Sequence, residues 1–186
     1  TPIQESAKVD EAPQAQAAPE VNIAEDAVET EEKTSHVQIS KLGGGLGDHR
    51  SFFDGKYGEG IDQGQYVRYS DDYLHVSFVE GGNYNLADGT AQDILIQFES
   101  TSTPSVSQAK AIETAEMFLP KDATKSGEGE HDETFYRILY TSQSLANVIP
   151  EGWFFNSQPG VFTVSLWHEE NDPSKVFAVS IYTGSN

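Results

Sequence analysis

Residues 161–183, VFTVSLWHEENDPSKVFAVSIYT, decide the fold that the sequence predicts. Apolar and polar side chains alternate on both sides of a polar turn at 169–174, which is typical of two antiparallel strands with one buried face. We therefore expect a hairpin with strands at 161–168 and 175–183. The side chains expected to face one another in its core are Phe162, Val164 and Leu166 on the first strand and Phe177, Val179 and Ile181 on the second.

The segments before this hairpin predict two helix-then-strand units. Strands are expected at 65–69, 73–79, 93–99 and 134–141. Helices are expected after Asp48, which can cap the first one, and at 105–119, where Ser105 and Gln108 form a capping box; a short third helix is expected at 142–149. The fold class is α+β: one antiparallel sheet of about six strands, two main helices on one face, and a possible duplicated helix–meander unit.

A change of composition near residue 36 predicts the domain organisation. Residues 1–35 contain nine acidic residues, two lysines and no aromatic residue, so they bury too little apolar surface to fold. We expect residues 1–41 to form a disordered acidic leash and residues 42–186 to form a single domain. Polar residues 125–133 are expected to be a loop. The glycines of 43–47 lack the Lys-Ser/Thr ending of a phosphate loop and are expected to form a flexible joint.

Composition excludes several classes of partner and site. A net charge of −19 repels nucleic acid, and the chain has no cysteine for thiolate chemistry. No apolar run has the roughly 20 residues that a membrane-spanning helix needs. The chain begins at Thr1 without Met, which fits a product whose export signal has been removed.

Several short segments carry a resemblance to a known group. They are 42–44 (LGG), 56–58 (KYG), 115–123 (AEMFLPKDA), 140–146 (YTSQSLA) and 160–164 (GVFTV). With these landmarks the chain resembles uncharacterised extracytoplasmic lipoproteins of Gram-positive bacteria, in which a lipid-bearing Cys precedes a leash and a small α+β domain. Its helix-then-meander units are similar to those of the beta-lactamase-inhibitor-protein group, whose members bind proteins on a concave sheet face. The resemblance implies an extracytoplasmic location at the cell envelope and a lipid anchor upstream of Thr1.

The sequence offers no recognisable catalytic or metal signature. None of the five histidines (His36, His49, His75, His131 and His168) pairs at the spacing of a helical metal site, and no cofactor or metal is expected. No nucleophile motif is present. An envelope enzyme acting on wall glycan or peptide is the alternative, and it would need a cleft around His49, His75 and Asp93. A purely structural surface domain is a further alternative.

Aromatic residues left over after the core is assigned give the candidate site. Tyr and Trp provide large contact areas at low entropy cost, so they are favoured at binding surfaces. Packing under loops is the competing explanation for the same residues. The candidate ligand-binding residues are Tyr69, Tyr73, Tyr136, Tyr140, Trp153, Trp167 and Tyr182. The function expected from them is non-catalytic binding of a protein or peptide partner by a domain tethered to the cell envelope.

Overall fold

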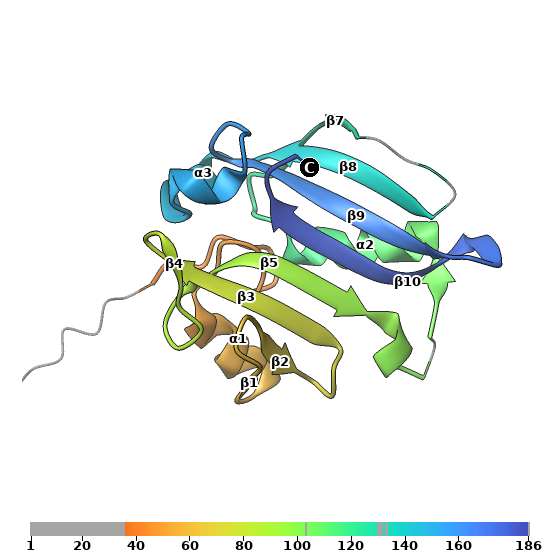
Figure 1. The fold of residues 1–186 in the computed structure, drawn as a ribbon, viewed down its shortest axis with the longest axis horizontal. Coiled ribbons are helices and arrows are strands. Elements are labelled where there is room, and N and C mark those ends of the chain that lie inside the picture. Colours follow the sequence, from red (N-terminus) through yellow and green to blue (C-terminus); the bar gives the residue numbers. More distant parts are fainter. Residues whose placement is uncertain (1–35, 103, 130–131, 133, 186) are drawn as a thin grey trace, which may run out of the picture. The chain divides into compact units, whose positions relative to one another are not determined.

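Ten antiparallel strands form one sheet in the computed structural model, which describes residues 36–102, 104–129, 132 and 134–185 (Figure 1). Along the sheet the strands are β1 (Ile61–Asp62), β2 (Val67–Tyr69), β3 (Leu74–Glu80), β5 (Thr90–Gln97), β10 (Asp172–Thr183), β9 (Val161–Glu169), β8 (Phe135–Thr141) and β7 (Thr124–Glu128). Off this path, β4 (Asn83–Tyr84) pairs with β3, and β6 (Val106–Ser107) pairs with β10.

The centre of the sheet joins an early and a late part of the chain. Strands β5 and β10 pair side by side, with Ile94 opposite Ile181 and Ile96 opposite Val179. On each side of this pair the neighbouring strands follow as an antiparallel meander, β3–β2–β1 on one side and β9–β8–β7 on the other. The core is therefore continuous across the junction.

The predicted fold class was wrong. The sheet is larger than expected and the α-helices are short, so the described domain is mostly antiparallel sheet. The described residues hold ten strands rather than about six, and each half of the main path has four strands rather than the three of the expected helix–meander unit. The missed strands are short or polar. Strand β7 has the sequence TKSGE at an exposed edge, where no buried face imposes an apolar alternation, so residues 125–133 read as a loop.

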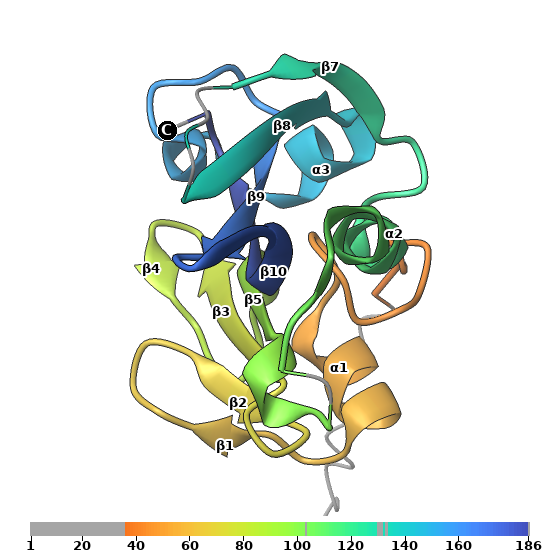
Figure 2. The same ribbon diagram turned by 90° about the vertical axis from the view of Figure 1, so that its right-hand side faces the viewer.

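Three short α-helices are found among the described residues, and they lie on one side of the sheet (Figure 2). They are α1 (Arg50–Tyr57), α2 (Gln108–Phe118) and α3 (Gln143–Val148), and two 3₁₀ segments, η1 (Phe98–Ser100) and η2 (Glu151–Phe154), connect strands and helices. None of these helices is long and apolar enough to cross a bilayer.

Both predicted helix caps differ from those in the structure. His49 caps α1 by accepting a hydrogen bond from the Ser51 amide, so Asp48 is free for another role. Ser107 rather than Ser105 caps α2. In each case a neighbouring polar residue competed for the same position, and local sequence does not distinguish between them.

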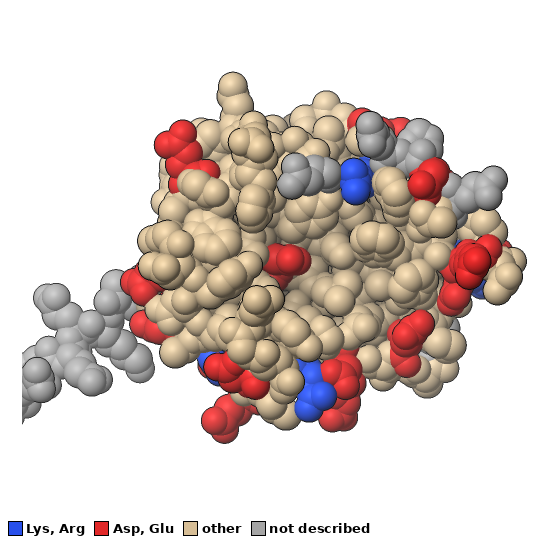
Figure 3. Space-filling view, viewed as in Figure 1, with Lys and Arg blue, Asp and Glu red and all other residues tan. Residues whose placement is uncertain are grey.

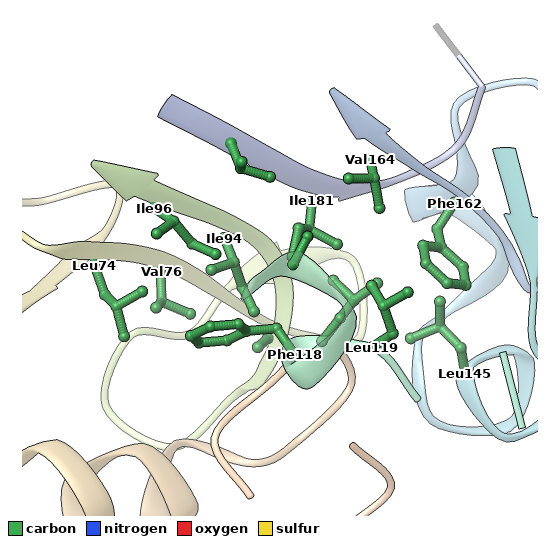
Figure 4. Close-up of a cluster of buried hydrophobic side chains, with 14 of the residues drawn as sticks. Leu74, Val76, Ile94, Ile96, Phe118, Leu119, Leu145, Phe162, Val164 and Ile181 are labelled. Carbon is green, nitrogen blue, oxygen red and sulfur yellow. The ribbon is translucent and has the colours of Figure 1, made fainter. Parts of the chain in front are cut away.

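Apolar side chains from the sheet and the helices meet in one core. Figure 4 shows Phe118 and Leu119, at and just after the end of α2, among Ile94, Ile181 and other side chains of the strands. In the β9–β10 hairpin, Val179 and Ile181 lie opposite Leu166 and Val164, as predicted. Nearer the turn, register shifts between Asp172 and Ala178 change which residues of the two strands lie opposite one another.

The register shifts explain one error in the predicted core. His168 pairs with Val176, whereas the adjacent Trp167 pairs with Ala178, so one extra residue is accommodated on β10. As a result Val176 is fully buried in place of the expected Phe177, which is only half-buried.

The carboxylate of Asp48 is fully buried and organises the loop before α1. It accepts hydrogen bonds from the amides of Ile39, Ser40, Gly44 and Gly45, at 2.7 to 3.1 Å, and from the Ser40 hydroxyl. This loop was expected to be a flexible joint and is instead packed. A Cβ atom on Gly45 would meet the Phe118 carbonyl oxygen at 2.4 Å, so the glycine permits a close backbone approach.

The described domain includes residues that the sequence assigned to the leash. Ile39 and Ser40 are buried, and the Lys41 amide donates to the Leu119 carbonyl at 3.0 Å. Residues 39–41 thus pack with the domain instead of preceding it. The rest of the predicted leash, residues 1–35, lies outside the described residues.

We predict that Asp48→Asn lowers the free energy of unfolding by about 3 kcal/mol, because the substitution removes a charge-assisted acceptor and points an amide donor at buried N–H groups. Urea denaturation of the full chain measures the change. Asp71→Asn is the matched control: Asp71 is exposed and has a left-handed backbone that Asn tolerates, so a change within about 0.5 kcal/mol is expected. Equal effects of the two substitutions would contradict the role of Asp48.

Candidate functional site

The face of the sheet opposite α1 and α2 is not covered by a described helix, and we call it the open face (Figure 2). Strand alternation determines which side chains lie on it, because Ile94 and Ile96 enter the core and their neighbours point the other way. The residues assigned to the open face by this register are His75, Ser77, Asp93, Leu95, Gln97, Phe135, Arg137, Leu139, Thr163, Ser165, Trp167, Ala178, Ser180 and Tyr182.

Small side chains make the middle of the open face hollow. Ser180 lies between Leu95 on β5 and Ser165 on β9, and Ala178 lies between Gln97 and Trp167. Larger side chains stand on the outer strands β3 and β8. Figure 3 shows the resulting hollow in a largely uncharged surface, with acidic atoms over β5 near its centre.

An aromatic and cationic rim borders the hollow on the β8–β9 side. Trp167 is 38% exposed, and its indole N–H donates to the Ser180 hydroxyl at 3.0 Å, which fixes the orientation of the ring. Its ring and that of Phe135 lie 6.1 Å apart between centroids. The guanidinium of Arg137 lies 4.6 Å from the centroid of the Phe135 ring, as in a cation–π contact.

Asp93 is the charged residue at the floor of the hollow. It lies between Ser77 on β3 and Tyr182 on β10, and its side chain is half-buried. Within the described residues its carboxylate makes no hydrogen bond and no ion pair, although buried carboxylates are normally paired. The Tyr182 hydroxyl instead lies 3.3 Å from the Ser165 hydroxyl.

Burial raises the pKa of the Asp93 carboxyl from 3.8 to about 6. Water reaches the floor of the hollow from one side only, so the Asp93 carboxylate is partly exposed to solvent and still poorly hydrated. No positive charge of the described residues offsets the lost hydration. A titratable group with a pKa perturbed in this way, lying in a hollow, is a candidate functional residue.

The β3 side of the open face has a closed set of polar contacts. His75 Nε2 lies 3.2 Å from Asp72 Oδ1 and 3.0 Å from Gln97 Nε2, and its ring stacks on Tyr66 with centroids 4.5 Å apart. The hydrogen bond with His75 is the main cause that lowers the pKa of Asp72, and Arg68 contributes. Because His75, Asp72 and Gln97 form hydrogen bonds with one another, the His75 imidazole is not available as a partner for the Asp93 carboxylate.

Two of the seven predicted aromatic site residues lie on the open face. They are Trp167 and Tyr182, which come from adjacent strands and flank the hollow. The alternation in 161–183 contained the signal that placed them there. Phe135 and Arg137 were not predicted as site residues, and Asp93 was named only for the enzymatic alternative, although alternation within their strands places all three on the open face.

Four of the other predicted residues pack on the helix side. Tyr69 is buried against Phe53, and its hydroxyl donates to Asp54 Oδ1 at 2.9 Å. Tyr140 is buried and stacks on Phe162. Tyr73 and Tyr136 are half-buried against the same core. These four rings contribute to the core instead of the hollow, because they occupy the other side of their strands or the turn between them.

Trp153 lies in η2, where it forms a separate aromatic cluster with Tyr84 and Phe155. Its indole N–H donates to the Gly81 carbonyl at 2.9 Å, and its ring centroid is 5.0 Å from that of Tyr84 and 6.3 Å from that of Phe155. Trp153 and Phe155 line a cavity of about 340 Å³. Phe155 has a left-handed backbone with φ 43° and remains exposed, a strained conformation for a bulky residue.

The three residues named for the enzymatic alternative do not form a cleft together. His49 contacts Ser51 and Asp88 near the start of α1, whereas His75 contacts Asp72 and Gln97. Neither imidazole interacts with Asp93 among the described residues. The open face therefore presents one unpaired carboxylate without a neighbouring acid–base partner.

Comparisons with known protein families, with curated proteins and with solved structures found no match to this chain. The function is consequently argued from the geometry of the open face.

We predict that Asp93→Asn raises the free energy of unfolding by about 2 kcal/mol at pH 7.5. Because the folded-state pKa of about 6 exceeds the ordinary 3.8, the native protein binds this proton more tightly, and stability falls as pH rises between about 4 and 6. The variant lacks this fall, so its advantage disappears below pH 4. Urea denaturation of both proteins across this range measures the difference, and a pH-independent difference would contradict the assignment.

Proposed function

We propose that this protein is a non-catalytic binding domain whose open face receives a protein or peptide segment that carries a Lys or Arg side chain next to an apolar one. The observation that carries the proposal is the unpaired, half-buried carboxylate of Asp93 in a hollow bordered by Trp167. A cation entering the hollow would pair with that carboxylate, while the indole would cover the adjacent apolar group.

The stability cost of Asp93 supports a functional role. A half-buried carboxylate without a partner destabilises the free protein, and natural proteins accept such costs mainly at functional sites. A partner's ammonium or guanidinium would remove the cost on binding. The pair would be weakly screened by salt, because the floor of the hollow is poorly exposed.

Charge across the whole chain favours the same class of partner. Thirty acidic residues face eleven basic ones, so a basic segment is attracted over long range and an anionic one is repelled. The Arg137 guanidinium on the rim can donate hydrogen bonds from its terminal N–H groups to a carboxylate or carbonyl group of the bound segment; its buried Nε has no hydrogen-bond partner among the described residues.

The proposal includes an extracytoplasmic location, with the domain tethered to the cell envelope through the acidic leash. Its support is the composition of residues 1–35 and the resemblance to envelope lipoproteins. Fractionation of the source cells tests this part: the proposal requires the chain in the envelope or culture medium, and its recovery from the cytoplasm would overturn it.

We predict that selection of a random peptide library on the immobilised full chain enriches peptides with a Lys or Arg beside an aromatic or aliphatic residue. Binding of the strongest peptide should weaken at least about tenfold in Asp93→Asn and in Trp167→Ala, equivalent to about 1.4 kcal/mol each. Because the carboxylate must be ionised to bind a cation, affinity should also fall as pH is lowered through about 6.

Phe155→Ala provides the matched control, because Phe155 is an exposed aromatic residue of the other cluster, 43% exposed against 38% for Trp167. It should leave the affinity unchanged. Loss of binding in Phe155→Ala with full binding in Trp167→Ala would transfer the site to the Trp153 cluster. Enriched peptides without a basic residue would refute the role of Asp93.

A further inference from the structure

Three potential metal ligands from distant parts of the chain meet beside the start of α1. They are His36, His49, which caps α1, and Asp88, in the loop between β4 and β5. One donor atom of each lies within 4.8 Å of the others. Sequence spacing gave no sign of this cluster, because 39 residues separate His49 from Asp88.

His49 and Asp88 are already held against each other. The His49 ring is nearly buried, and its Nε2 lies 2.9 Å from Asp88 Oδ1 and 3.0 Å from the Asp88 carbonyl oxygen. Main-chain hydrogen bonds fix the two segments on either side: the Arg50 amide donates to the Gly89 carbonyl, and the Ala91 amide donates to the Asp48 carbonyl, both at 2.9 Å. Two ligands of the cluster are therefore preorganised.

Ser51 can orient His49 for a metal ion. The Ser51 hydroxyl lies 3.0 Å from His49 Nδ1. When Nε2 binds a metal ion, the proton of the neutral imidazole resides on Nδ1, so Nδ1 gives up the hydrogen bond from the Ser51 amide that caps α1 and donates to the Ser51 hydroxyl oxygen instead. A hydrogen bond of this kind to the far nitrogen is the usual support of a metal-bound histidine.

His36 provides the third ligand from an exposed position. Its ring stacks on that of His49 with a centroid distance of 3.4 Å and an interplanar angle of 7°. Three residues later the Ile39 amide donates to Asp48, which anchors the segment. Ligand atoms around a tetrahedral ion lie about 3.4 Å apart for bonds of about 2.0–2.1 Å. Imidazole binds a metal ion in the plane of its ring, so closing the site requires the exposed His36 ring to turn out of its stack on His49 and the exposed Asp88 side chain to rotate toward the ion.

We propose that His36, His49 and Asp88 form a binding site for a divalent transition-metal ion of the zinc type, with water completing the coordination. Two imidazoles and one carboxylate suit Zn²⁺ and its neighbours in the transition series, whereas Ca²⁺ and Mg²⁺ prefer ligand sets made of oxygen. The bound ion links residue 36 to the β4–β5 loop and so stabilises the folded domain.

Isothermal titration of the untagged, metal-free full chain with Zn²⁺ tests the site. One equivalent should bind, and His36→Ala and Asp88→Asn should each weaken binding at least tenfold. Both substitutions are at exposed positions, so folding, checked by circular dichroism, should be retained. Glu170→Gln removes an exposed carboxylate elsewhere and should leave the Zn²⁺ affinity unchanged.

Thermal unfolding gives an independent readout. Zn²⁺ at a hundredfold excess over its dissociation constant should raise the folding equilibrium constant of the parent chain about a hundredfold, with a much smaller effect in His36→Ala. The proposal is overturned if the parent chain binds no equivalent of Zn²⁺, if all variants bind equally, or if Ca²⁺ binds the same site as tightly as Zn²⁺.

Discussion

The buried carboxylate of Asp48 is the interaction on which the rest of the domain depends. Five donors from residues 39–45 converge on it, so a glycine-rich segment with few apolar side chains becomes a fixed element. The carbonyl of the same residue accepts the Ala91 amide and so joins this segment to β5. An anion supplied by the chain itself thus occupies the kind of amide nest that elsewhere binds a phosphate.

The second constraint is that the three described α-helices lie on one side of a large sheet. The core fills that side, and Figure 4 shows side chains from β3, β5, β9 and β10 meeting α2 there. The other face then has to be stable without a covering layer. Small polar side chains such as Ser165 and Ser180 satisfy this requirement at its centre, because they form hydrogen bonds to neighbours and bury little apolar surface.

Two local conflicts with stability lie where binding is proposed or where an aromatic residue is exposed. Asp93 is a half-buried carboxylate without a described partner, and Phe155 is an exposed ring on a left-handed backbone. Elsewhere, Ser70, Asp71 and Asp72 have left-handed backbones, and the buried His168 ring has no hydrogen-bond partner among the described residues. Conflicts at an exposed surface, such as those at Asp93 and Phe155, are typical of functional positions.

The sequence by itself determined the α+β class, the positions of the longer strands and helices, and the alternation that put Trp167 and Tyr182 on one side of the last hairpin. Period-two alternation assigns side chains to two faces, but it does not say which strands become neighbours or which face the helices cover. Only the tertiary structure decided that Tyr69 and Tyr140 enter the core, that polar β7 extends the sheet, and that His36, His49 and Asp88 meet. These outcomes depend on contacts between residues far apart in the chain, which no local pattern encodes.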